Sequence, residues 1–99
     1  MLPKVTIIMP SLNVADYIEE CIKSAVFQTL KEIEILCIDA GSTDGTLEIL
    51  QKYADMDRRI RLINSDRRSY GYQVNLGIRQ AQGEYVAILE TDDYIAESM

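Results

Sequence analysis

The sequence predicts an α/β fold in which a parallel β-sheet is covered by helices on both faces, giving three layers. Two observations lead to this class. Four short runs rich in β-branched residues alternate with three stretches whose apolar residues recur at helical spacing. The strand-like runs are apolar at nearly every position, as expected for strands buried on both faces. The 99 residues contain no repeat, low-complexity segment or linker, so we expect a single domain over 1–99.

The first half of the chain predicts two strands and two helices. The run 5–9 is typical of a buried strand that ends at Pro10, and Asn13 is the candidate N-cap of the helix that follows. The apolar residues of this helix share one face, and they are Ile18, Cys21, Ile22, Ala25 and Val26. The run 33–38 predicts a second buried strand. The turn 41–45, whose polar side chains suit capping, then leads into a helix. The apolar side of that helix comprises Leu47, Leu50 and Ala54.

The second half predicts two further strands around a third helix. The run 60–63 is a weaker strand, and the run 85–89 is a fourth strand. Between them, the helical stripe consists of Val74, Gly77, Ile78 and Ala81. Gly83 is placed to stop this helix as the residue just beyond its C-cap. The predicted order is therefore strand and helix in strict alternation, with a strand at each end.

Composition and charge exclude several functional classes. There are 10 Lys and Arg against 16 Asp and Glu, a formal charge of -6, so we expect no nucleic-acid partner, whose phosphates would call for a basic surface. The chain has no histidine, which excludes Ser-His and Cys-His nucleophile pairs and imidazole zinc sites. Any chemistry must therefore use carboxylates, hydroxyls, amides and arginines.

The cysteines and the hydropathy pattern bear on the compartment. Cys21 and Cys37 lie within apolar runs, which favours reduced core thiols over a disulfide framework. No apolar stretch approaches the length of a transmembrane segment, and residues 1–4 do not resemble a signal peptide. We expect a cytoplasmic protein, with a peripheral position at the inner face of the membrane as the alternative for a full-length protein.

Polar residues collect after each predicted strand. Open parallel sheets bind ligands beyond the carboxyl ends of their strands. The segments at those positions are 10–13, 39–44, 64–68 and 90–93. Three of the four carry carboxylates, so this edge is the candidate binding site.

Individual residues at this edge have both functional and structural interpretations. Adjacent Asp92 and Asp93 suit a hard divalent cation such as Mg²⁺, and phosphate oxygens would complete the coordination shell of that ion. The alternative is that they lie in a solvated loop that caps a helix. Asp39 could accept hydrogen bonds from a ribose or a base, or cap the next turn. Arg67 and Arg68 could face a diphosphate, or lie in solvent.

The absence of several motifs weighs against other classes of α/β protein. The first loop has no G-x-G-x-x-G, which weighs against a dinucleotide-dependent oxidoreductase, and the chain has no P-loop. Receiver and phosphatase domains of similar architecture need an acidic residue just after the first strand, where this chain has 10–13 (Pro-Ser-Leu-Asn).

Taken in order, these segments resemble the N-terminal, nucleotide-binding part of the family 2 glycosyltransferases, which have the GT-A fold. The matching segments are 5–13, 18–24, 28–29, 38–46, 75–78, 83–85 and 89–93. They cover nearly the whole chain at family-like spacing. The resemblance, together with right-handed crossovers, implies a Rossmann-like sheet of order 3-2-1-4. It also implies that the acceptor-binding half lies beyond this chain.

The resemblance implies inverting transfer of a sugar from a nucleotide diphosphate donor, with UDP-sugar as the expected donor. The acceptor would be a saccharide or a lipid-linked glycan in polysaccharide or glycoconjugate synthesis. The residues expected to bind the nucleotide sugar are Pro10, Ser11, Leu12, Asp39, Arg68, Thr91 and Asp92. Asp93 is expected to bind the divalent metal, Mn²⁺ or Mg²⁺, which would neutralise the leaving diphosphate.

Several positions depart from the family pattern. Leu12 stands where an aromatic residue often stacks near the base, and Ala40 replaces the second Asp of the usual Asp-Asp-Gly-Ser. Val74 occupies a position where many members carry Arg. We expect Arg67 or Arg68 to make that phosphate contact instead.

Two rival functions stay open. A sugar-nucleotidyltransferase has the same architecture but requires a Gly- and Arg-rich loop after the first strand, and residues 11–13 do not form such a loop. A non-catalytic nucleotide-binding or interaction domain is the other alternative. The general base of inverting transfer is expected beyond residue 99, so we expect this chain alone to be inactive. The apolar run 85–89 predicts an exposed strand edge and a homodimer.

Overall fold

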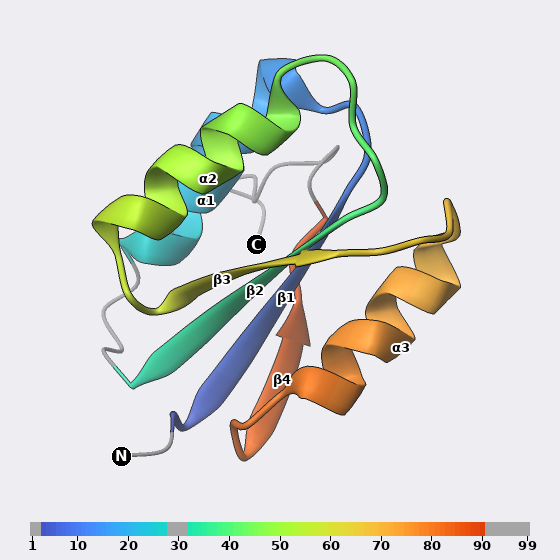
Figure 1. The fold of residues 1–99 in the computed structure, drawn as a ribbon. Coiled ribbons are helices and arrows are strands. Elements are labelled where there is room, and N and C mark those ends of the chain that lie inside the picture. Colours follow the sequence, from blue (N-terminus) through green and yellow to red (C-terminus); the bar gives the residue numbers. More distant parts are fainter. Residues whose placement is uncertain (1–2, 28–31, 91–99) are drawn as a thin grey trace.

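The computed structural model describes residues 3–27 and 32–90 and contains a four-stranded parallel sheet. The strand order is β3-β2-β1-β4, which confirms the predicted order 3-2-1-4 (Figure 1). The elements along the chain are β1 (Val5–Ser11), α1 (Ala15–Val26), β2 (Ile33–Asp39), α2 (Thr46–Met56), β3 (Ile60–Asn64), α3 (Tyr70–Gln80) and β4 (Tyr85–Ile88). All strand pairs are parallel, as the alternation of strands and helices requires.

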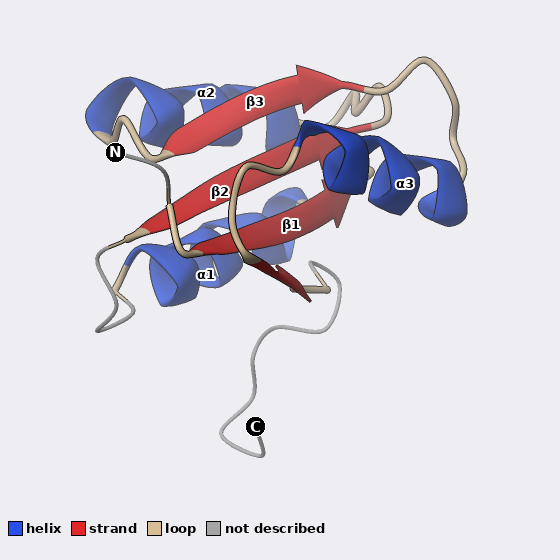
Figure 2. Ribbon diagram, turned by 90° about the horizontal axis from the view of Figure 1, so that it is seen from below, coloured by secondary structure: helices blue, strands red, loops and turns tan. Residues whose placement is uncertain are grey.

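Helices cover both faces of the sheet, which confirms the three-layer arrangement. Helices α1 and α2 pack side by side on one face, and α3 lies on the other (Figures 1 and 2). Side chains of β2 alternate between the two cores, because successive residues of a strand point to opposite faces. Ile35 and Cys37 join the core under α1 and α2, whereas Leu36 and Ile38 join the smaller core under α3.

The predicted face of α1 is confirmed, and that of α2 is confirmed in part. Ile18, Cys21, Ile22 and Ala25 are buried. In α2, Leu50 is buried as predicted, but Leu47 and Ala54 are only half-buried. Tyr53 fills the remaining space because its hydroxyl can reach the surface, where it donates a 2.7 Å hydrogen bond to Glu19.

Strand β1 continues through Pro10, so the prediction that it ends there is wrong. The Ser11 carbonyl accepts a hydrogen bond from the Ala40 amide on the β2 side, and the Ile8 carbonyl accepts one from the Leu89 amide on the β4 side. Alternate residues of a strand face the same neighbour, so Pro10 faces the β4 side. Its missing N–H therefore costs no β1–β2 ladder bond.

Helix α3 packs through a face that shares Gly77 with the predicted stripe but is rotated away from Ile78. Its buried residues are Gln73 and Gly77, while Ile78 is 50% exposed. A Cβ on Gly77 would lie 2.8 Å from Cγ2 of Ile8, so the glycine allows the helix to approach β1 closely. This close approach, rather than the apolar stripe, sets the rotation of the helix.

Gly83 does not terminate α3, which is a second correction. The helix ends at Gln80, and its C-cap residue Ala81 is extended, with φ -68° and ψ 136°. Gly83 instead lies against the start of β1, where its amide donates a 2.9 Å hydrogen bond to Oγ1 of Thr6. Its role is therefore to permit close approach of two backbones.

A buried carboxylate holds the α3–β4 connection on the sheet. Glu34 accepts hydrogen bonds from the Thr6 hydroxyl at 2.7 Å and from the Gln82 amide at 2.6 Å. Arg61 lies 3.4 Å from its other oxygen and forms an ion pair with it. Thr6 and Glu34 are register partners on β1 and β2. This network lies at the amino ends of the strands, opposite the candidate site.

Strand β4 is exposed along its length within the described part of the chain. Tyr85 is 61% exposed, and Val86 and Ile88 are each 44% exposed. Cys21 and Cys37 are buried thiols that form no disulfide in the described part of the chain, as predicted. Among the described helices, none combines the length and the apolar character needed to cross a bilayer.

Candidate functional site

The carboxyl ends of β1 and β2 bring Ser11 and Asp39 into contact. The two residues are register partners, and both are buried. The Ser11 hydroxyl donates a 2.9 Å hydrogen bond to Oδ1 of Asp39. Pro10 is buried beside them in β1, and Leu12 is half-buried at the start of the following loop. Four of the predicted site residues therefore meet at this edge of the sheet.

Asp39 organises the turn that follows β2. In addition to Ser11, its Oδ1 accepts a 2.6 Å hydrogen bond from the Ser42 hydroxyl. Its Oδ2 accepts hydrogen bonds from the amides of Gly41 at 3.0 Å and Ser42 at 2.8 Å. A carboxylate offers about four acceptor positions, and these four bonds occupy them. Asp39 thus caps the turn, the structural role that the sequence left open beside base recognition.

The turn 41–46 caps α1, the helix that precedes it in the chain. Three successive backbone amides, those of residues 13–15, donate to side chains of this turn, and the acceptors are Ser42 Oγ, Thr46 Oγ1 and Asp44 Oδ2. The distances are 2.9, 2.9 and 3.1 Å. The turn side chains were expected to cap the following helix. Asp44 does so in part, because its Oδ1 accepts a 3.1 Å hydrogen bond from the amide of Thr46, the first residue of α2. The three bonds from residues 13–15 serve instead a helix start about 30 residues earlier in the chain.

Asn13 does not cap α1, so this prediction is wrong. The helix begins at Ala15 after Val14, and Asn13 has a positive φ of 52°, which Asn tolerates better than most residues. Its side-chain oxygen accepts a 2.8 Å hydrogen bond from the Thr43 amide. The loop 11–14 and the turn 41–46 therefore hold each other by reciprocal bonds. Protein groups alone thus hold the two loops to each other.

Asp44 makes this arrangement sensitive to acid. The hydrogen bond from the Thr46 hydroxyl, with backbone bonds from Ala15 and Thr46, holds the pKa of Asp44 below its ordinary value against an opposing desolvation effect. A carboxyl whose pKa is lower in the folded state contributes stability above its unfolded pKa of about 3.9. That contribution disappears as the pH falls through the folded pKa.

We therefore expect Asp44→Asn to lose less stability than the wild type when the pH is lowered below about 4. The measurement is urea denaturation at a series of pH values. Asp66→Asn, which removes an exposed carboxylate of the β3–α3 loop, is the matched control for the loss of one surface charge. An unchanged slope in Asp44→Asn would contradict the role assigned to this residue.

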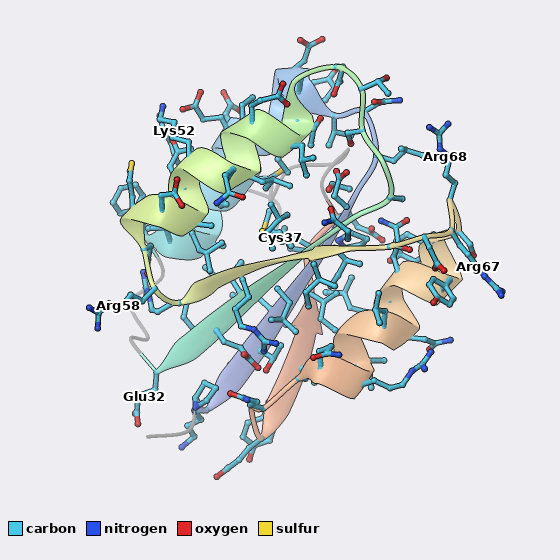
Figure 3. All side chains as sticks on the ribbon, viewed as in Figure 1. Glu32, Cys37, Lys52, Arg58, Arg67 and Arg68 are labelled. Carbon is cyan, nitrogen blue, oxygen red and sulfur yellow. The ribbon has the colours of Figure 1, made fainter. Side chains whose placement is uncertain are left out.

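Two arginines lie at the same end of the sheet. Arg67 and Arg68 project from the loop after β3, and Glu32 marks the opposite end (Figure 3). A guanidinium nitrogen of Arg68 lies 3.4 Å from the Gly41 carbonyl, next to the turn that Asp39 caps. The Arg67 guanidinium lies over the ring of Tyr72, 5.1 Å from its centre. Arg68 thus borders the candidate site, whereas Arg67 is engaged with α3.

Gln73 reaches the site from α3 and was not predicted. Its amide Nε2 donates to the carbonyls of Ser11 at 3.1 Å and Ile38 at 2.8 Å. It lies four residues before Gly77, on the same helix face. The spacing from Gly77 could have indicated that Gln73 faces the sheet. The prediction for this helix considered only its apolar residues and therefore missed it.

Glu90, the second residue after β4, is held by contacts with α3 and α1. The Tyr70 hydroxyl donates a 2.6 Å hydrogen bond to the side chain of Glu90, and the Cys21 thiol lies 3.8 Å from the Glu90 carbonyl. Thr91, Asp92 and Asp93, which carry the predicted metal and ribose contacts, lie outside the described residues. Within residues 3–27 and 32–90, no group of three carboxylates or thiols is arranged to hold a metal.

Among residues 3–27 and 32–90, the groups at this edge are suited to binding and include no reactive thiol. The thiol closest to Asp39 in sequence, Cys37, is buried, and burial together with the charge of Asp39 raises its pKa to about 12. It therefore remains protonated and unreactive near neutral pH. What the described residues offer is a backbone held by hydrogen bonds, the carboxylates of Asp39 and Asp44, and the guanidinium of Arg68.

Comparison with known proteins places the chain in a family. The model for "Glycosyl transferase family 2" matches residues 6–99. The uncharacterized glycosyltransferase EpsJ of Bacillus subtilis is 41% identical over 99 residues, which are 100% of this chain and 29% of EpsJ. This chain therefore spans under a third of that relative's length.

Solved structures agree with the fold. The mannosyltransferase PcManGT from Pyrobaculum calidifontis, in complex with GDP-Man and Mn²⁺, superposes with a TM-score of 0.84 at 30% identity, over 95% of this chain and 29% of that one. S. aureus TarS in complex with UDP-GlcNAc gives a TM-score of 0.81 at 31% identity, over 96% of this chain and 28% of TarS. These structural neighbours have the GT-A fold. Because the family model covers nearly the whole chain, this chain belongs to glycosyl transferase family 2.

Proposed function

We propose that this chain is the nucleotide-sugar-binding part of an inverting glycosyltransferase that uses a UDP-sugar. The observation that carries the proposal is the pair of mutually bonded loops at the carboxyl edge of the sheet, with Arg68 beside them. Prearranged loops lower the entropic cost of binding. The nucleotide sugars bound by PcManGT and TarS support this ligand class, and the UDP-GlcNAc of TarS supports uridine.

Asp39 takes part in base recognition through an exchange of hydrogen bonds. Its four acceptor positions are occupied, but two of the donors are the hydroxyls of Ser11 and Ser42, which can rotate to other acceptors. A base N–H then replaces one hydroxyl at Oδ1. Pro10, Ser11 and Leu12 line the base and ribose, and Arg68 contacts the diphosphate.

The metal requirement rests on the residues that follow β4. Glu90, Asp92 and Asp93 supply only carboxylate oxygens, which suit Mn²⁺ or Mg²⁺. We assign the metal to Asp93 and the ribose to Thr91 and Asp92. A bound divalent ion neutralises charge on the diphosphate leaving group. The Mn²⁺ in PcManGT supports a divalent metal.

The test is calorimetric titration of UDP into this chain with Mn²⁺ and with EDTA. We expect weak binding that requires the metal, and we expect Asp93→Ala to remove the metal dependence. Glu20→Ala, which removes an exposed carboxylate in the middle of α1, is the matched control and should bind as the wild type does. Equal affinity with Mn²⁺ and EDTA would exclude the metal role and favour a non-catalytic nucleotide-binding domain.

The acceptor and the catalytic base belong to the remaining proposal. Inverting transfer needs a general base that deprotonates the acceptor hydroxyl. The carboxylates assigned above contact the nucleobase, the ribose and the metal instead. The acceptor is a saccharide or a lipid-linked glycan, and its site and the base lie in sequence beyond residue 99. This chain alone therefore binds the donor without transferring sugar. The exposed apolar side chains of β4 favour self-association as a homodimer.

A further inference from the structure

Gln73 is a buried amide at the point where the candidate site begins. The residue is only 4% exposed, because its side chain projects from α3 toward the sheet. Its Nε2 donates two hydrogen bonds, one to the last residue of β1, Ser11, and one to Ile38 in β2. Carbonyl oxygens only accept, so the amino group of the side chain must face both strands. One side chain thus connects α3 to two neighbouring strand ends.

Packing alone does not require an amide here. The Ser11 carbonyl already accepts a hydrogen bond from the Ala40 amide at 3.0 Å. An unbranched apolar residue such as methionine would fill a similar volume without burying polar atoms. The amide adds direction, because its two donors fix the carbonyls at one separation and orientation.

The two carbonyls flank the residues that matter for binding. Ser11 precedes Leu12, and Ile38 precedes Asp39. The peptide planes that Gln73 holds therefore set the position of the first loop and of the Asp39 carboxylate. The same helix begins directly after the loop that carries Arg68, so its docking also brings that arginine to this edge.

We propose that Gln73 is a positioning residue for the nucleotide site, acting through the strand-end carbonyls rather than by touching the ligand. The inference rests on the proposed nucleotide binding. It predicts that loss of the two donors reduces affinity for UDP beyond what loss of helix packing does.

The experiment compares two Gln73 variants with a packing control on the same helix. Gln73→Met keeps the length and removes both donors. Gln73→Glu removes them when ionised and restores one when protonated. Leu76→Ala leaves the amide in place but weakens packing on Ile8, Leu36 and Ile38. For each variant, UDP affinity with Mn²⁺ is measured by calorimetry, and stability is measured by urea denaturation.

We expect Gln73→Met to bind UDP about tenfold more weakly, since two hydrogen bonds that fix the site are lost. Leu76→Ala should lose stability but stay within about twofold of wild-type affinity. A buried carboxyl facing carbonyl oxygens titrates above its ordinary range. Gln73→Glu should therefore bind UDP weakly at about pH 8.5. At about pH 5.5 its affinity should recover toward that of the wild type measured at the same pH.

Each outcome decides between the alternatives. Wild-type affinity in Gln73→Met, or an equal loss in Leu76→Ala at matched stability, overturns the positioning role while leaving nucleotide binding intact. If the wild type itself does not bind UDP, the proposed function fails and this inference fails with it. If Gln73→Met does not fold, the acid recovery of Gln73→Glu decides, and a constant ratio to the wild type across pH overturns the proposal.

Discussion

Replacing Asp39 with alanine is expected to lower the free energy of unfolding by about 3 kcal/mol and to abolish nucleotide binding. The carboxylate is fully buried and accepts four hydrogen bonds from Ser11, Gly41 and Ser42. Without it, the two backbone amides of the turn lose their acceptor, and the loop loses its connection to β1. A fully buried donor without an acceptor costs about 1–3 kcal/mol, and the sum is smaller here because Gly41 is exposed and Ser42 half-buried.

The measurement for Asp39→Ala is urea denaturation followed by circular dichroism, with UDP titration on the folded variant. Ser42→Ala is the matched comparison, because it leaves the carboxylate three donors while it removes the Ser42 hydroxyl, which donates to Asp39 and accepts from the exposed Asn13 amide. It should cost about 1 kcal/mol. If Asp39→Ala costs no more than Ser42→Ala, the carboxylate does not organise the turn, and its role would be confined to the ligand.

A methyl group at Gly83 is expected to destabilise the protein by about 2–3 kcal/mol. A Cβ there would lie 2.7 Å from the Thr6 backbone nitrogen and 2.8 Å from both Thr6 Oγ1 and the Val5 carbonyl carbon. Two of these atoms are backbone atoms at the start of the central strand β1, so they cannot rotate away. Either the β1–β4 pairing or the hydrogen bond from the Gly83 amide to Thr6 must give way.

Gly71→Ala provides the control for Gly83→Ala within the same part of the chain. Gly71 lies in the first turn of α3, and a Cβ there would meet nothing within 4 Å. Alanine is the better helix former, so this change should be neutral or stabilise by up to about 1 kcal/mol. Thermal and urea unfolding of both variants test the pair. Equal destabilisation of the two would show that the close approach at Gly83 is not the cause.

The sheet could be predicted from sequence because its signals are local. Each of the four strands is a short run with its own composition, and Ile35 and Leu36 are apolar in succession because β2 is covered on both sides. Right-handed crossovers and the family resemblance then leave one strand order. The end of β1 was predicted wrongly at Pro10, because the sequence does not show which neighbouring strand the backbone nitrogen of Pro10 faces.

Helix ends and helix rotation were harder because their determinants are distant. Asn13 carries the ordinary signal of an N-cap, but the acceptors for α1 come from Asp44 and its neighbours, 29 to 32 residues away. Helix α3 is rotated so that Gly77 meets Ile8 on another element. Neither partner can be identified from the local pattern.

The candidate site was predicted in part for the same reason. Ser11 and Asp39 each end a strand, and parallel strands place their carboxyl ends together, so their contact follows from topology. Gln73 joins them from a helix face whose rotation the sequence did not reveal. The assignments to Thr91, Asp92 and Asp93 remain predictions.

The strand order has a consequence for how the chain folds. Strand β1 is the first to be synthesised, yet it lies between β2 and β4, and its pairing of Val5 with Tyr85 joins residues 80 positions apart. Such long-range closure is slow, because its entropic cost precedes any stabilising contact. At about 5–20 residues per second, translation leaves several seconds between completion of β2 and of β4. During that interval the β4-facing edge of the central strand is unpaired, and it is then the part of the molecule most open to pairing with a neighbouring chain.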